Sequence, residues 1–320
     1  MSGRYSRREL LGVASAGVLA CRAGDGRAAV PPRRPGVVGL AELAPAGGAP
    51  DLESCRSAVA RALAAATGRE SGNEAVRTLF RPDDVVGIKV NCLAGKRMSP
   101  RVELVEAFAR LLVDGGVAES RIIVFERSSR ELEQAGFSIR RGGGPYRCFG
   151  IDNDWDRQPS ISGAIGSCFA RLVSEQCTAL VSFGVVKDHD LAGVSAGLKN
   201  LYGLIHNPNK YHDNNCDPYL ADVAQHLRAK LRLTVLDGAT AQCHGGPAFY
   251  AAGSFALSKV AASTDPLAAD AWAWAEIDAE RRRRELPTLE AEKRAPRFLA
   301  TAERYGLGVG DPARVERVRA

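Results

Sequence analysis

Apolar residues recur along the chain in two alternating patterns. Between residues 52 and 67, Leu52, Cys55, Val59 and Leu63 follow the helical spacing of three or four positions. Residues 85–90 (Val-Val-Gly-Ile-Lys-Val) form a short continuous apolar run that is typical of a buried strand. The same two patterns predict further helices at 99–115, 167–176, 217–227 and 266–277, and further strands at 121–125, 179–186, 231–236 and 255–261.

This alternation predicts an α/β fold with a mostly parallel sheet flanked by helices. The right-handed crossover rule makes the strands at 85–90 and 121–125 parallel. We therefore expect a Rossmann-like open sheet, from which residues 137–163 make an excursion. No Gly-x-Gly-x-x-Gly fingerprint follows a predicted strand, which argues against a standard dinucleotide domain. Residues 193–200 also do not match the Walker A motif of phosphate-binding loops, because their glycines are too close together and no Ser or Thr follows the lysine.

The N-terminal segment predicts an export signal. Arg7 and Arg8 precede a short apolar run that ends at Ala20, a pattern that resembles a twin-arginine (Tat) signal. We expect the Tat machinery to export the chain to the periplasm or the extracellular space. Attachment of a lipid to Cys21 and ordinary cleavage after Ala20 or Ala23 are both compatible with this segment. The predicted organisation is a signal peptide at 1–29, a linker at 30–50, an α/β domain at 51–280 and a charged helical tail at 281–320.

Composition and charge narrow the function classes. The 320 residues include 43 Lys and Arg against 37 Asp and Glu, a formal charge of +6, and residues 1–29 hold five arginines against two acids. This balance gives little support to nucleic-acid binding. The eight cysteines form no CxxC pair, so we expect no ferredoxin-type iron–sulfur module. No later apolar run approaches about 20 residues, so we expect no transmembrane span in the mature chain.

Polar residues gather where the predicted strands end. Lys89 and Asn91 end the strand at 85–90, and Lys187 and His189 follow the strand at 179–186. Ligands of open parallel sheets bind beyond the carboxyl ends of the strands, so we expect a cleft there. The residues expected to line it are Lys89, Asn91, Lys187, His189, Lys199, Asn200, His206, His212, Asp237 and His244, with Gly245 and Gly246 close by.

Several of these segments together resemble a known family. Gly-Ile-Lys-Val-Asn (87–91), Lys-Asp-His (187–189), Gly-Leu-Lys-Asn-Leu-Tyr-Gly (197–203) and Ser-Thr-Asp-Pro-Leu-Ala-Ala-Asp (263–270) resemble the DUF362 family of uncharacterised proteins. The likeness covers roughly residues 83–275. Some members carry an iron–sulfur segment, but this chain lacks those cysteines. The resemblance implies a fold and a site region, and it supplies no reaction.

One hypothesis for the cleft is a divalent metal site. His189, His212 and His244 would supply imidazole ligands, because imidazole and thiolate suit zinc, iron or nickel. The ligands would have to converge from separate loops, since no compact metal-binding signature is present. Further ligands would come from Asp190 or Asp217 and from Cys216 or Cys243.

A second hypothesis is a site for a small carboxylate or phosphate. Lys89, Lys187 and Lys199 would bind the anion, and His189 or His212 would act as general acid or base. Lys89 lies within an apolar strand, so its ammonium group needs an acidic partner. The candidates are Asp237 and Asp265, although Asp265 can also be interpreted as the cap of a helix. The residues expected to contact the ligand or a cofactor are Asn91, Asn200, His206, Asp237, Gly245 and Gly246.

We favour an enzyme that acts on a small acidic molecule with the help of a metal or of the lysines. The alternative is a non-enzymatic periplasmic binding or accessory protein that delivers a metal or cofactor to a partner. The sequence does not name the substrate, the metal or the oligomeric state.

Overall fold

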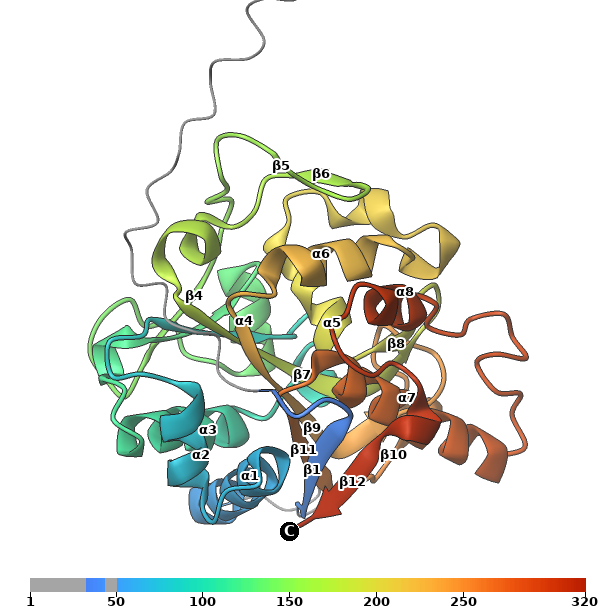
Figure 1. The fold of residues 1–320 in the computed structure, drawn as a ribbon, viewed down its shortest axis with the longest axis horizontal. Coiled ribbons are helices and arrows are strands. Elements are labelled where there is room, and N and C mark those ends of the chain that lie inside the picture. The colour runs from blue at the N-terminus through green and yellow to red at the C-terminus, as the bar shows by residue number, and fades with distance from the viewer. Residues whose placement is uncertain (1–32, 44–50) are drawn as a thin grey trace, which may run out of the picture.

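The computed structural model describes residues 33–43 and 51–320, so the predicted export signal lies outside the described residues. A single mixed sheet runs through this part of the chain in the strand order β12-β1-β11-β9-β7-β2-β3-β4 (Figure 1). Its strands are β1 (Val37–Glu42), β2 (Val86–Val90), β3 (Ile122–Glu126), β4 (Arg147–Gly150), β7 (Ala179–His189), β9 (Leu231–Gln242), β11 (Lys259–Ser263) and β12 (Glu316–Arg319). Two short strands, β8 (Gly193–Ser195) and β10 (Ser254–Phe255), pair with β7 and β9.

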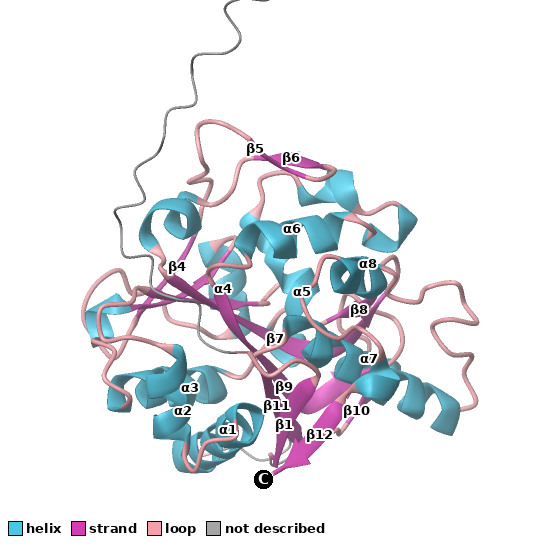
Figure 2. Ribbon diagram, in the orientation of Figure 1, coloured by secondary structure: helices cyan, strands magenta, loops and turns pink. Residues whose placement is uncertain are grey.

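The middle of the sheet is parallel. Strands β9, β7, β2, β3 and β4 pair in parallel, whereas β11 is antiparallel to both of its neighbours, β9 and β1. Figure 2 shows these strands crossing the molecule between two groups of helices. The predicted α/β class with a mostly parallel sheet flanked by helices is therefore confirmed.

Helices cover both faces of the sheet. They are α1 (Leu52–Thr67), α2 (Gly72–Leu79), α3 (Val102–Asp114), α4 (Ser129–Ala135), α5 (Gly197–Asn200), α6 (Tyr219–Leu227), α7 (Pro266–Arg283) and α8 (Phe298–Arg304). Successive residues of a strand point to opposite faces, so Val181 packs with α1 and α3, and Leu180 packs with α6 and α8. None of the helices in the described ranges is long and apolar enough to cross a bilayer.

Local sequence explains where the longest helix begins. Asp265 caps α7 by accepting hydrogen bonds from Leu267 N at 2.9 Å and Ala268 N at 3.1 Å. Pro266 occupies the first turn of α7. Backbone N–H groups in the first turn have no acceptor within the helix, so the lack of an N–H in proline costs no hydrogen bond there. The interpretation of Asp265 as a helix cap is confirmed, and its carboxylate does not reach Lys89.

Five segments differ from the sequence-based expectation. The range assigned to a linker, 30–50, contains β1, and the range assigned to a helical tail, 281–320, contains α8 and the edge strand β12. Residues 137–163 contribute β4 to the sheet before forming β5 (Ser160–Ser162), the first strand of a hairpin completed by β6 (Ile165–Ser167). The predicted helix at 167–176 is one π-helical turn, Leu172–Gln176, and the predicted strand at 255–261 is divided between β10 and β11.

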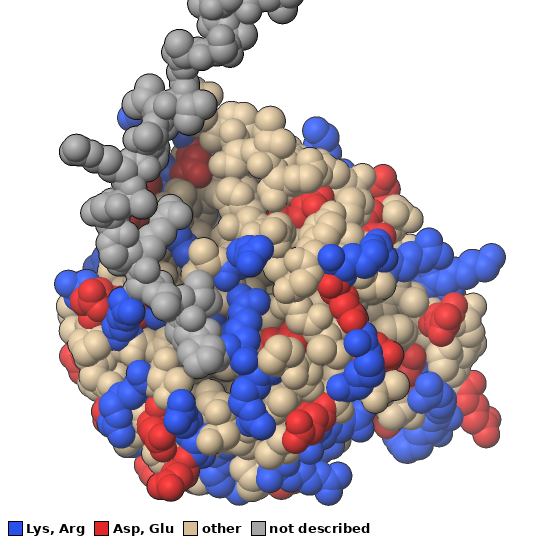
Figure 3. All heavy atoms as spheres, viewed as in Figure 1, with Lys and Arg blue, Asp and Glu red and all other residues tan. Residues whose placement is uncertain are grey.

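Figure 3 shows basic and acidic side chains interspersed over one face of the molecule.

Candidate functional site

A pocket of about 630 Å³ opens at the carboxyl ends of three adjacent parallel strands, β2, β3 and β7. The chain that follows β8 covers it, first as α5 and then as two short 3-10 turns, Leu201–Leu204 and Pro208–Tyr211. The lining residues are Lys89, Asn91, Leu93, Glu126, Arg127, Glu131, Lys187, His189, Ser195, Lys199, Asn200, Tyr202, Gly203, His206, Asn207, Pro208, Asn209, Lys210, His212 and Pro247.

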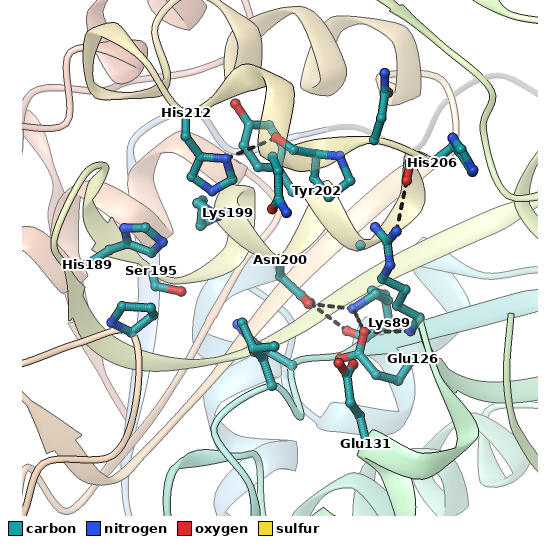
Figure 4. Close-up of a pocket in the computed structure, with 18 of the residues that line it drawn as sticks. Lys89, Glu126, Glu131, His189, Ser195, Lys199, Asn200, Tyr202, His206 and His212 are labelled. Carbon is teal, nitrogen blue, oxygen red and sulfur yellow. Dashed lines mark hydrogen bonds and ion pairs between the residues drawn. The ribbon is translucent and has the colours of Figure 1, made fainter. Parts of the chain in front are cut away.

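One end of the pocket is built around a buried ion pair. Lys89 Nζ donates to Glu126 Oε1 at 2.6 Å and to Asn200 Oδ1 at 2.9 Å (Figure 4), and also to Val90 O at 2.7 Å. Glu126 also accepts from Cys92 N at 2.8 Å and from Arg127 N at 2.6 Å. Because an ammonium group has three donors, Lys89 has none left for a ligand. Its partner is Glu126, so the predicted pairing with Asp237 or Asp265 was wrong, and we assign Lys89 a positioning role.

Gly203 closes over this ion pair. A Cβ at Gly203 would stand 2.5 Å from Lys89 Cε and 2.7 Å from Lys89 Nζ. Replacing Gly203 by alanine is therefore expected to displace the ammonium group and to lower the free energy of unfolding by about 1–3 kcal/mol, the usual cost of overpacking. Thermal and urea unfolding measure this change. Gly142→Ala is the matched control, since nothing lies within 4 Å of that added Cβ. Equal stability of the two variants would contradict the expectation.

Two further lysines face the pocket without a carboxylate partner. Lys187 is 1% exposed, and its Nζ donates to Pro247 O at 3.0 Å. Lys199 Nζ lies 4.6 Å from the centre of the Tyr202 ring, and no hydrogen bond or ion pair of this group occurs among the described residues. Burial lowers the pKa of each lysine to about 8, and the charge of Lys199 adds to the effect on Lys187. Among the described residues, neither of these two ammonium groups forms an ion pair with a carboxylate.

His189 and His212 form a stacked pair beside these lysines. Their ring centres are 5.8 Å apart with an angle of 28° between the planes. Pro208 O lies 2.9 Å from His212 Nδ1, a contact that requires Nδ1–H and leaves the lone pair on Nε2. His189 has the opposite arrangement, because Leu191 N and Ala192 N donate to its Nδ1 at 3.1 and 3.2 Å. Its proton is therefore on Nε2.

The electrostatic surroundings keep both rings neutral. Burial, followed by the charges of Lys199 and His212, lowers the pKa of His189 to about 2. Asp190 Oδ1 also lies 2.9 Å from His189 Nδ1, but it is largely exposed and accepts from Leu191 N. Burial and the charge of Lys199 lower the pKa of His212 as well. His189 thus offers an Nε2–H donor to the pocket, and His212 offers the basic nitrogen Nε2.

A buried carboxylate holds the segment that carries Lys199 and Asn200. Asp270, which is fully buried in α7, accepts from Gly197 N at 2.8 Å and from Leu198 N at 3.1 Å, the first two residues of α5. Burial raises the pKa of Asp270 to about 7. The Asp270 side chain is fully enclosed and contacts the backbone of α5. It fixes the start of the short helix beside the pocket.

Some predicted site residues lie elsewhere. Asp237 accepts from Arg101 N at 2.9 Å and from Arg101 Nε at 3.2 Å, and it does not line the pocket. His244 and Gly245 are exposed outside the lining, and His244 packs edge-on against Tyr250. Gly246 N donates to Asp188 Oδ1 at 2.9 Å, so this glycine supports the neighbouring strand end. Of the predicted residues, Lys89, Asn91, Lys187, His189, Lys199, Asn200, His206 and His212 do line the pocket.

Other lining residues were missed by the sequence analysis. Glu126 ends β3 and Arg127 follows it, so the same strand-end argument that selected Lys89 would have selected them. Glu131, from α4, also faces the pocket, and burial followed by the charge of Glu126 raises its pKa. Ser195 and Tyr202 complete the wall beside the histidines.

The donor set does not favour a metal. Within residues 33–43 and 51–320, no three His, Cys, Asp or Glu side chains are grouped so that they could hold an ion. The proposed trio is divided, because His189 and His212 stack while His244 lies outside the pocket.

The fold and the site together define an α/β protein with a lysine- and histidine-lined pocket at the carboxyl edge of a parallel sheet. Residues 86–275 match the family described as "Domain of unknown function (DUF362)", and the chain belongs to this family. No curated protein matches the sequence. A crystal structure of a protein from Thermotoga maritima is similar at 13% identity with a TM-score of 0.38, and the match covers 62% of this chain and 53% of that one. The matched part thus spans about half the length of that protein.

Proposed function

We propose that the pocket binds a small organic anion and that the protein is an enzyme acting on it. The observation that carries this proposal is the pair of lysines, Lys187 and Lys199, which face the same cavity while neither ammonium group forms an ion pair with a carboxylate of the described residues. A carboxylate or phosphate between them would supply the missing negative charge. A divalent cation at the same place would be repelled by both lysines, so the anion hypothesis has the stronger support.

The histidine pair supplies the proposed acid–base function. His212 Nε2 carries a lone pair beside the lysines and is the proposed general base. His189 is the proposed hydrogen-bond donor, since its Nδ1 is occupied by two backbone N–H groups. Both rings are held by backbone contacts, which fix their protonated nitrogens before a ligand arrives. Removing a proton from the carbon next to a carboxylate requires at least two kinds of group. One is a set of cations that stabilises the negative charge, here the lysines, and the other is a base that accepts the proton, here His212.

The direct test is the affinity for malonate as a function of pH. Malonate is expected to bind best near pH 7 and to lose about tenfold in affinity by about pH 9, because lysines with a pKa of about 8 give up their protons over this range. Unperturbed lysines, with a pKa near 10.4, would leave the affinity constant over the same interval. Isothermal titration calorimetry at constant ionic strength gives the profile. A flat profile, or no binding at all, would contradict the proposed anion site.

Turnover separates the two functional classes. Screening small carboxylic acids for solvent deuterium exchange or consumption tests the enzymatic part of the proposal. Malonate binding without turnover of any acid would favour the alternative of a periplasmic binding or accessory protein.

We also propose that the protein is exported through the Tat route, on the strength of Arg7 and Arg8. Replacing both by lysine is expected to leave most of the chain in the cytoplasmic fraction, because that route depends on the arginine pair. Cell fractionation and immunoblotting measure the distribution. Arg27→Lys, which keeps the pair intact, is the control and is expected to be exported normally. Identical distributions for the two variants would overturn this assignment.

A further inference from the structure

The four lysines of the pocket differ in what holds their ammonium groups. Lys89 has three acceptors, and Lys187 has one, Pro247 O. Lys210 lies exposed at the rim, with its Nζ 5.6 Å from the Tyr211 ring centre. Lys199 differs from the first two because no oxygen acceptor holds its Nζ in the part of the chain that the structure describes. Unlike Lys89 and Lys187, and unlike the exposed Lys210 at the rim, Lys199 is thus an amine inside the pocket that can approach a ligand without first breaking a hydrogen bond.

The surroundings of Lys199 favour loss of its proton. The charge of Lys89 opposes the ammonium form, and Lys199 and Lys187 repel each other. Two groups counteract this and raise the pKa of Lys199: Cys216, when its thiol is ionised, and Asp190, which is largely exposed. An amine that is desolvated beside another cation is the arrangement that makes a lysine nucleophilic. Asp270 fixes the start of α5, so the helix presents this amine in a defined position.

We propose that Lys199 is a covalent nucleophile that forms an imine with the carbonyl carbon of a small oxo acid. This inference rests on the proposed function, and it narrows the substrate class from acids in general to acids that also carry a ketone or aldehyde. Lys187, which keeps its contact to Pro247 O, is positioned to hold the carboxylate. The division of roles follows from the contacts, because Pro247 O holds the ammonium group of Lys187 in place, whereas no oxygen acceptor among the described residues holds that of Lys199.

The step balances without an oxidant or a reductant. The lone pair of neutral Lys199 Nζ forms a C–N bond as the π bond of the carbonyl breaks, and the oxygen becomes a hydroxyl. The two hydrogens of the amine leave with this oxygen as water, giving C=N, and the imine nitrogen takes up one proton from solvent. His189 Nε2–H can donate a hydrogen bond to the departing oxygen, and His212 Nε2 can accept a proton from the adjacent carbon.

The test is reductive trapping with pyruvate as the probe. The full chain is incubated with pyruvate and sodium cyanoborohydride near neutral pH, and the adduct is located by intact-mass measurement and peptide mapping. We expect one adduct per chain, on Lys199, and at least a tenfold lower yield when excess malonate competes for the pocket. Lys199→Arg is expected to abolish the adduct. Lys293→Arg is the control, because Lys293 is exposed outside the pocket.

Each outcome decides between the two proposals. Malonate binding without an adduct would overturn the imine while leaving the proposed anion site in place. An adduct on Lys187, or one scattered over surface lysines and insensitive to malonate, would also overturn the assignment to Lys199. Absence of both malonate binding and adduct would remove the proposed function together with this inference. Mapping is done on the unsubstituted protein, so a poorly folding variant would not obscure the answer.

Discussion

Replacing Glu126 by leucine is expected to lower the free energy of unfolding by about 3–5 kcal/mol, the usual effect of removing one partner of a buried ion pair. The side chains of Lys89 and Glu126 are 3% and 5% exposed, so the remaining ammonium group would be buried with no charge to balance it. The change would also leave Cys92 N and Arg127 N without their acceptor. Urea unfolding followed by circular dichroism measures the loss.

The double variant Lys89→Met/Glu126→Leu provides the decisive comparison. Removing both charges eliminates the uncompensated ammonium, so the double variant is expected to be more stable than Glu126→Leu alone. Together with the single variants Lys89→Met and Glu126→Leu, the double variant completes a double-mutant cycle. The interaction energy from this cycle separates the contribution of the ion pair from the effect of lost packing. Strict additivity of the two single changes would show that the pair is not coupled.

Replacing Lys199 by methionine is expected to weaken malonate binding by about 10- to 100-fold, which corresponds to the loss of one charge-assisted contact of about 1.5–3 kcal/mol. The same change is expected to raise the melting temperature by about 2 °C, the effect of roughly 1 kcal/mol in the free energy of unfolding of a large domain. The folded state lowers the pKa of Lys199 to about 8, so the protonated form is disfavoured on folding, and this cost is fully present below that pH. It decreases as the pH rises from about 8 to the ordinary lysine value near 10.4.

Calorimetry and thermal unfolding at pH 7 test both parts of this prediction. Lys293→Met is the matched control, because it removes an exposed lysine outside the pocket and is expected to change neither quantity. Undiminished affinity together with a lower melting temperature would assign Lys199 a structural role. Improved stability with lost binding is the pattern expected of a group positioned for function.

Local patterns predicted much of the fold. The continuous apolar run at 85–90 became β2, and Asp265-Pro266 begins α7 as expected. The edge strand β12 was missed because its sequence, Glu-Arg-Val-Arg, is mostly exposed and carries charges, as edge strands often do. Its pairing with β1 depends on a neighbour nearly 280 positions away, and such partnerships leave no local periodicity.

The strand-end argument found most of the pocket but not its partnerships. It placed Lys89, Lys187, His189 and His212 correctly, because parallel strands end at one edge of the sheet. It also included Asp237 and His244, because the predicted strand ended at residue 236, whereas β9 continues to Gln242. Asp237 is instead paired with Arg101 at the start of α3, and His244 lies on an exposed turn. Being near a strand end does not determine the direction in which a side chain points.

The sequence by itself determined the helices α1, α3, α6 and α7, the buried strands β2, β3, β7 and β9, and the stock of lysines and histidines near the strand ends, because these follow from the spacing of apolar residues over a few positions. Only the tertiary structure decided that Glu126 neutralises Lys89 while Lys199 has no acceptor. The reason is that hydrogen bonds and charge interactions act over a few ångströms, and packing of segments more than 30 positions apart sets those distances.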